Sequence, residues 1–124
     1  MAATELKPIY LTDYDVFVKE TLNTAFAAVD ADEGAYLNVS GRDEQYVIGI
    51  TNTHQETAKA VTIKAGNHIQ SEFGDITISL DAGEITWIVL SSGKFKNVFG
   101  DNKSKIIITG DSTDIEVKVI RLPF

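Results

Sequence analysis

The sequence contains no cysteine, and this absence removes several kinds of chemistry together. Without thiols the chain has no disulfide, no thiolate zinc site, no iron–sulfur ligand and no cysteine nucleophile. Histidine is almost as scarce, since only His54 and His68 occur, both in polar, turn-rich surroundings. A lone loop histidine is usually solvated, and neither has the neighbours that a catalytic base or a metal site requires. We therefore expect no enzymatic activity, no cofactor and no metal.

Long apolar runs and an excess of basic residues are missing as well. No stretch reaches the ~20 apolar residues that span a bilayer, and the first eight residues lack the basic and then apolar order of a signal peptide. The net charge of −7 argues against binding to nucleic acid, because lysine and arginine must displace counterions from the phosphates. We expect a protein of the cytoplasm or of a virion, with neither a nucleic-acid partner nor a membrane partner.

Three short motifs approach functional signatures without completing them. Residues 30–34 begin like a calcium loop but lack its third oxygen ligand and its later bidentate glutamate. Residues 100–104 have the composition of an anion-binding turn but not the spacing of a P-loop. Asp43 and Glu44 are adjacent, so on a strand they would point to opposite faces and could not act as a carboxylate pair. All three are predicted to be solvated turns or strand ends.

Charge divides the chain into two parts. Residues 1–35 carry seven acidic side chains and two lysines, a net charge of −5, which leaves −2 for residues 36–124. We therefore predict an acidic N-terminal segment, called the front segment below, followed by a nearly neutral domain over 36–124.

Residues 36–124 have the pattern of an all-β domain. From Gln45 onward, apolar and polar residues alternate in short runs separated by turn residues, which is typical of half-buried strands. The pattern predicts seven or eight strands in a two-sheet sandwich or jelly-roll-like domain. The clearest runs are residues 46–50, 61–63, 76–80, 85–90, 95–99, 105–109 and 114–121.

The run at 85–90 is apolar on both faces except at Thr86. Strands of this kind are usually central and covered on both sides, so we predict that Trp87 lies in the core. The alternative is that Trp87 is exposed and stacks on a sugar.

The front segment allows two structures. An apolar stripe at helical spacing after Thr12 or Asp13 predicts a short helix, whereas the β-branched and aromatic content of 9–12 and 16–18 favours an extended arm. The stripe consists of Val16, Phe17, Leu22, Phe26 and Val29.

Exposed apolar residues in the front segment would form an interface with another protein. The candidate interface residues are Ile9, Tyr10, Leu11, Tyr14, Phe17 and Phe26. On this hypothesis a chain that lacks residues 1–30 still folds but no longer binds its partner. The alternative is that Phe17, Leu22 and Phe26 fill the domain's own core.

The order of motifs from residue 31 to the end resembles a family of small phage structural proteins, the head decoration or auxiliary capsid proteins. The motifs that carry the resemblance are Ala31-Asp32-Glu33-Gly34, Asn38 with Gly41-Arg42, Val61-Thr62-Ile63 before Ala65-Gly66-Asn67, Asp81-Ala82-Gly83-Glu84, Ser92-Gly93-Lys94-Phe95-Lys96 and the closing Leu122-Pro123. The resemblance implies a non-enzymatic β-domain that sits on an assembled shell, commonly as a homotrimer. It carries over no catalytic or ligand-binding residue, and the longer, more acidic front segment departs from the shorter relatives.

The expected function is therefore that of a virion protein that binds and stabilises the capsid surface. Its partner would be the major capsid protein or another virion protein, which it would meet after synthesis in the host cytoplasm. One alternative is a phage tail or head-to-tail connector protein. Another is a carbohydrate-binding module, which needs exposed aromatic side chains on one sheet face, with Tyr36, Tyr46 and Trp87 as candidates.

Overall fold

Ten strands and no α-helix make up the part of the chain that the structure, a computed structural model, describes. The described residues are 3–11, 13, 15, 17, 19, 26–39, 45–66, 74–90, 95–97, 100, 103–111 and 113–123. The predicted all-β fold is confirmed. Among these residues no helix is long and apolar enough to cross a membrane.

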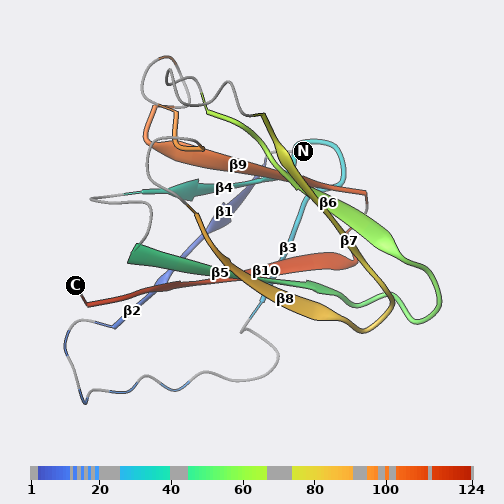
Figure 1. Cartoon of the computed structure of the whole chain (residues 1–124), viewed down its shortest axis with the longest axis horizontal. Coiled ribbons are helices and arrows are strands. Elements are labelled where there is room, and N and C mark those ends of the chain that lie inside the picture. Colours follow the sequence, from blue (N-terminus) through green and yellow to red (C-terminus); the bar gives the residue numbers. More distant parts are fainter. Residues whose placement is uncertain are drawn as a thin grey trace.

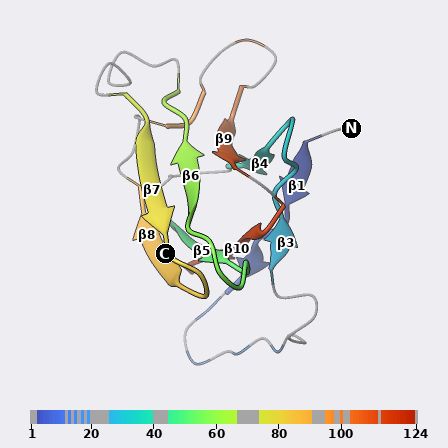
Figure 2. The ribbon, with the colours of Figure 1, turned by 90° about the vertical axis from the view of Figure 1, so that its right-hand side faces the viewer.

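The strands form two sheets that face each other (Figures 1 and 2). The first sheet has the order β1 (Thr4–Leu6), β4 (Ala35–Asn38), β9 (Lys105–Gly110), β6 (Lys59–Ile63) and β7 (Ile76–Leu80). The second sheet has the order β2 (Ile9–Tyr10), β10 (Ile115–Arg121), β5 (Tyr46–Asn52) and β8 (Ile85–Val89), and β3 (Ala27–Ala28) also pairs with β10. The β1–β4 and β2–β10 pairs are parallel, and the other pairs are antiparallel.

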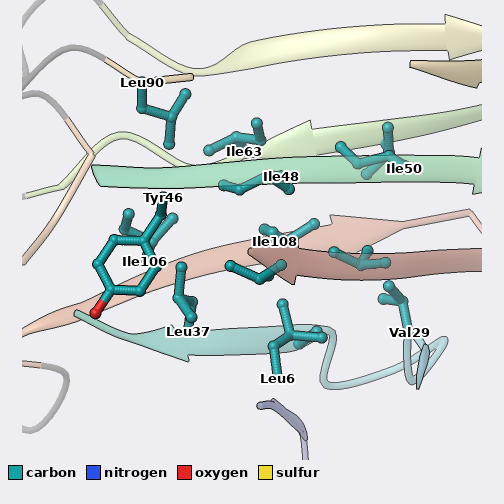
Figure 3. Packing of buried hydrophobic residues seen from close by; sticks show 14 of the residues in the cluster. Leu6, Val29, Leu37, Tyr46, Ile48, Ile50, Ile63, Leu90, Ile106 and Ile108 are labelled. Carbon is teal, nitrogen blue, oxygen red and sulfur yellow. The ribbon is translucent and has the colours of Figure 1, made fainter. Parts of the chain in front are cut away.

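The core fills the space between the two sheets (Figure 3). Each long strand contributes alternate residues to it, as period-two geometry requires. In β5, for example, Tyr46, Ile48 and Ile50 are buried. The two residues between them, Val47 and Gly49, belong to the outer face of the sheet. Ile106 and Ile108 of β9 are buried in the core from the first sheet.

Asn52 is the one buried polar side chain among the described residues, and it is fully hydrogen-bonded. Its Nδ2 donates to the carbonyls of Thr57 and Leu80, each at 3.0 Å, and its Oδ1 accepts the N–H of His54 at 3.0 Å. Buried amides are stable only when they are satisfied in this way. The Asn52 side chain therefore connects the end of β5 in the second sheet to the end of β7 in the first.

The front segment is part of both sheets. Leu6 and Val29 are buried in the core, the Thr4 N–H donates to the Gly34 carbonyl at 3.0 Å, and the Val29 N–H donates to the Ile115 carbonyl at 2.9 Å. Through β1, β3 and the residues next to them, the segment therefore packs on its own domain. Because these contacts involve both sheets, we expect that removal of residues 1–30 disrupts folding, in contrast to what a removable arm would do.

The short helix predicted within the front segment is not seen in the described residues. Val16 and Leu22 of the proposed stripe lie outside them. At the end of the stripe, β3 is extended rather than helical, and the following Val29 points into the core.

The prediction that β8 is central and that Trp87 is core is wrong. β8 ends the order of the second sheet, and no described strand pairs with its other side. Trp87 is 50% exposed. The turn that brings the chain from β7 to β8 is as predicted, because Gly83 takes a φ of +80° and the Glu84 N–H donates to the Asp81 carbonyl at 3.0 Å.

Candidate interaction surface

Five of the six residues predicted to form an interface are described by the structure, and they differ in exposure. Ile9 and Leu11 are half-buried in or beside β2, and Phe26 is half-buried before β3. Tyr10 and Phe17 are exposed, at 48% and 77%. Tyr14 lies outside the described residues.

Tyr10 is also engaged within its own domain. The Arg121 guanidinium lies 5.8 Å from the centroid of the Tyr10 ring and 5.9 Å from that of the buried Tyr46. A cation between two aromatic rings is attracted to both faces, and this contact joins β2 to β10 and β5. Tyr10 therefore contributes to holding the front segment in place, whatever else it binds.

A different apolar surface lies on the outer face of the second sheet. Ile85, Trp87 and Val89 of β8 all point outward, and they are 47%, 50% and 51% exposed. The sheet register places Val89 opposite Val47 of β5, which in turn pairs with Ile120 of β10. We call this surface the outer apolar face, and it consists of Val47, Ile85, Trp87, Val89 and Ile120.

Gly49 determines how Trp87 lies on this face. The two residues are direct cross-strand partners, and a Cβ added to Gly49 would lie 2.7 Å from Cε3 and 2.8 Å from Cη2 of the indole. The ring therefore occupies the space above the glycine, which no other residue would leave open. A glycine inside a strand often marks such a close approach. Glycine within the run at 46–50 was the sequence feature that could have located the Trp87 side chain.

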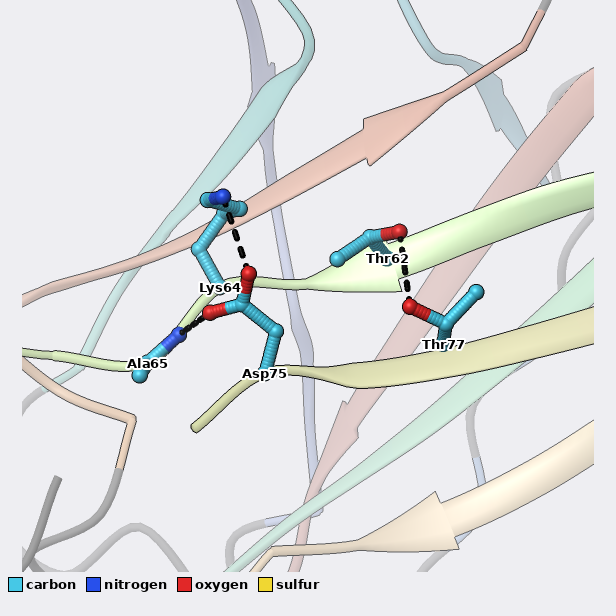
Figure 4. A network of polar contacts seen from close by, with 5 residues as sticks. All are labelled: Thr62, Lys64, Ala65, Asp75 and Thr77. Carbon is cyan, nitrogen blue, oxygen red and sulfur yellow. Dashed lines mark hydrogen bonds and ion pairs between the residues drawn. The ribbon is translucent and has the colours of Figure 1, made fainter. Parts of the chain in front are cut away.

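The outer face of the first sheet is polar by contrast (Figure 4). The Thr62 and Thr77 hydroxyls are hydrogen-bonded across β6 and β7 at 3.2 Å. Asp75 accepts hydrogen bonds from the Ala65 N–H at 2.6 Å and from the Lys64 ammonium at 2.9 Å. The Ala65 N–H first, and Lys64 second, hold the pKa of the Asp75 carboxyl below its usual value.

The remaining edge of the same sheet is polar too. The Asn38 amide donates to the Glu5 carboxylate at 3.1 Å, and the Lys105 ammonium lies 4.5 Å from the centroid of the Tyr36 ring. Polar contacts thus occur on this face at β1, β4 and β9 as well as at β6 and β7.

Two residues or motifs considered for chemistry have structural roles. The His54 Nδ1 accepts the N–H groups of Glu56 and Thr57 at 3.1 and 2.9 Å, which stabilises the turn after β5. The Asp30 Oδ2 accepts the N–H groups of Asp32 and Glu33 at 3.2 and 2.7 Å. The motif at residues 30–34, which begins like a calcium loop, is therefore an acidic turn.

No group of three or more metal-ligating side chains occurs within the part of the chain that is described. His68 lies outside that part.

Comparison of the chain with protein-family models, with curated proteins and with solved structures finds no match. The sheet order and the surfaces described above define the class of the protein as a two-sheet β-sandwich that carries an apolar surface on the outside of its second sheet, along β8.

Proposed function

We propose that this protein is a non-enzymatic virion protein that binds the surface of a phage capsid and stabilises it, with the outer apolar face as its contact surface. The observation that carries the proposal is the half exposure of Ile85, Trp87 and Val89 on one strand. Contiguous exposed apolar side chains on a small domain are typical of protein–protein interfaces, and tryptophan is prominent among residues that dominate binding energy.

The resemblance to head decoration proteins supplies the kind of partner. Two of the motifs that carry it are tight turns at the ends of strands, at residues 30–34 and 81–84, which is a common arrangement in compact β-domains. The partner that we propose on this basis is the major capsid protein. Because the chain carries a net charge of −7, a capsid surface with basic side chains around an apolar centre would complement it.

Stabilisation of a shell requires no chemistry beyond contact. A protein that binds only the assembled shell lowers the free energy of that state, and many copies on one lattice multiply a modest contact. A homotrimer on the shell is what the resemblance implies. The exposed Tyr10 and Phe17 would then be available for a second contact between subunits.

The proposal is tested by pelleting the protein with expanded capsids. Val47→Lys places a charge in the centre of the outer apolar face, on β5 rather than on the sheet edge, and is expected to weaken binding at least tenfold. Thr77→Lys is the matched control, since it places the same charge on the outer face of the first sheet. Thermal melts of both variants verify that they remain folded. Equal pelleting of Val47→Lys and the unmodified protein would contradict the proposal.

A carbohydrate-binding role is the second candidate, and the exposure of Trp87 favours it. Such modules stack sugars on exposed aromatic rings of a sheet face. Of the three aromatic residues considered, however, Tyr46 is 1% exposed and Tyr36 lies under Lys105. Binding on a glycan array that is lost in Trp87→Ala would support this role. A tail or connector protein would be recognised by rings or tubes in electron micrographs.

A further inference from the structure

β8 is an edge strand of the second sheet in the part of the chain that the structure describes. Among the described strands it has a partner on one side only, β5, and its pairing with β5 is continuous from Ile85 to Val89 without a bulge. Natural proteins usually protect such edges with lysine, proline, bulges or very short strands. The sequence Ile-Thr-Trp-Ile-Val contains no charge and no proline. The edge is therefore suited to pairing with another strand.

The hydrogen bond at the start of β8 determines which backbone groups face the open side. The Asn52 N–H donates to the Glu84 carbonyl at 3.1 Å, one position beyond the β5–β8 ladder. In an antiparallel pair, hydrogen-bonded and non-hydrogen-bonded positions alternate. The backbone groups of Thr86 and Ile88 therefore face β5. Those of Ile85, Trp87 and Val89 face away from it.

The large side chain in the middle of the strand does not obstruct this edge. The Trp87 indole lies over Gly49 of β5. It therefore extends toward β5 and away from the open edge of β8. A further strand can therefore approach the N–H and carbonyl groups of Trp87 without displacing the ring.

We propose that the occupant of this edge is a second copy of the chain, whose β8 pairs antiparallel with the first around a two-fold axis at Trp87. In this register Trp87 faces the partner's Trp87, and Ile85 faces the partner's Val89. All three outward-facing residues of each strand then lie at hydrogen-bonded positions. Any shifted register leaves one of them without a partner.

The sequence of β8 allows the strand to pair antiparallel with a second copy of itself. Read from either end, it places a branched aliphatic residue at the outer positions and Trp87 at the centre, so that Ile85 meets valine and Thr86 meets isoleucine. Cross-strand pairs of branched and aromatic residues are favourable, and no like charges meet. The acidic front segment joins the second sheet at β2, the opposite end from β8, so the pair keeps the two front segments apart.

The paired sheets would have a combined surface larger than that of either chain. The outer apolar faces of the two copies become continuous across the axis, with both Trp87 rings near its centre. Strand pairing over five residues buries less than the roughly 1,600 Å² of a typical stable complex. We therefore expect a concentration-dependent equilibrium between one chain and two.

Sedimentation velocity across a wide concentration range tests the proposal on the full chain. The expected result is a shift from the mass of one chain to that of two. Ile85→Pro removes an N–H that faces the open side at the first residue of an edge strand, where proline is tolerated. This variant should remain a single chain, with circular dichroism unchanged. The matched control, Thr77→Lys on β7, should self-associate as the unmodified chain does.

A disulfide test reports the register directly. The chain has no cysteine, so Trp87→Cys introduces a single thiol. Directly opposed residues at a hydrogen-bonded position lie about 5.5 Å apart between Cα atoms, which a disulfide can bridge. Under mild oxidation Trp87→Cys should form covalent pairs at least tenfold faster than Thr77→Cys.

Three results would overturn the proposal. They are a single-chain mass at all concentrations, a mass of three chains, or a pair that persists in Ile85→Pro. None of these depends on capsid binding, which Val47→Lys tests at a residue away from the open edge. The two proposals can therefore fail separately.

Discussion

The two sheets of this sandwich have similar inner faces and very different outer faces. Outside the first sheet, polar side chains contact one another, as in the pairs Thr62 with Thr77 and Lys64 with Asp75. Outside the second sheet, Ile85, Trp87 and Val89 remain about half exposed. Both sheets bury the same core, so the difference between them lies in their outer faces. It is this difference from which we propose that the second outer face binds a protein.

The largest loss of stability is expected when strands are removed from the two sheets. Removal of residues 1–30 deletes β1, β2 and β3 and takes Leu6 and Val29 out of the core. We expect the truncated chain to lose cooperative thermal unfolding, measured by calorimetry. A chain that lacks only residues 1 and 2 is the control and should melt as the full chain does. A sharp melting transition in the truncated chain would show that residues 31–124 fold without the front strands.

Replacement of an isoleucine in the core and of one on the outer apolar face compares how much each contributes to the free energy of unfolding. Ile108 is completely buried, and Ile108→Ala should lower the free energy of unfolding by about 2–5 kcal/mol, because it removes core contacts and leaves a cavity. Ile85→Ala, measured by urea denaturation at a concentration where single chains predominate, should cost under about 1 kcal/mol. Similar losses in the two variants would mean that the outer apolar face is covered within the chain.

The contact between Gly49 and Trp87 can be isolated by a double-mutant cycle. Gly49→Ala should destabilise the protein by about 1–3 kcal/mol, because the added methyl group displaces the indole. In a Trp87→Ala background the same substitution should have little effect or should stabilise the strand. Chemical denaturation of the four proteins gives the coupling energy. Additive effects would show that the ring does not lie over the glycine.

The smallest effect concerns the polar face and depends on pH. The folded protein holds the Asp75 pKa below its ordinary value, through the Ala65 N–H and then Lys64, so ionised Asp75 stabilises the fold. This contribution is complete above the pKa of the unfolded chain and is lost as the pH falls through the lower pKa of the folded protein. Asp75→Asn should therefore be less stable than the unmodified protein at neutral pH, and the difference should shrink in acid. A difference that is constant from pH 7 to pH 2 would contradict this linkage.

Alternation in the sequence predicted the long strands and their inner faces. In β5 and β10 the residues expected to share a face, among them Ile48, Ile50 and Val117, are indeed buried together. Alternation fails for β8, because a strand that is apolar on both faces has the same pattern whether a second layer of its own chain or another protein covers it. The register between β8 and β5 was needed to place Trp87 over Gly49.

The front segment was difficult for a different reason. β2 and β3 contain two residues each and β1 contains three, too few for a period to be recognised. Their positions depend on pairing with strands far away in the sequence, and composition contains no information about that pairing. The candidate interface residues were mostly aromatic, with Ile9 and Leu11 beside them, whereas Leu6 and Val29 are the residues of the segment that lie in the core.

The parallel pair between β2 and β10 has a consequence for the order of folding. Ile9 pairs with Ile120, so the second sheet joins an early strand to β10, and β10 lies between β2 and β5. During synthesis on a ribosome, β5 can pair with β8 early, but it cannot pair with β10 until β10 has emerged. Contacts between residues so distant in sequence slow folding and prolong the exposure of unpaired edges. Synthesis of the closing strand is then the step that commits the nascent chain to its native sheet.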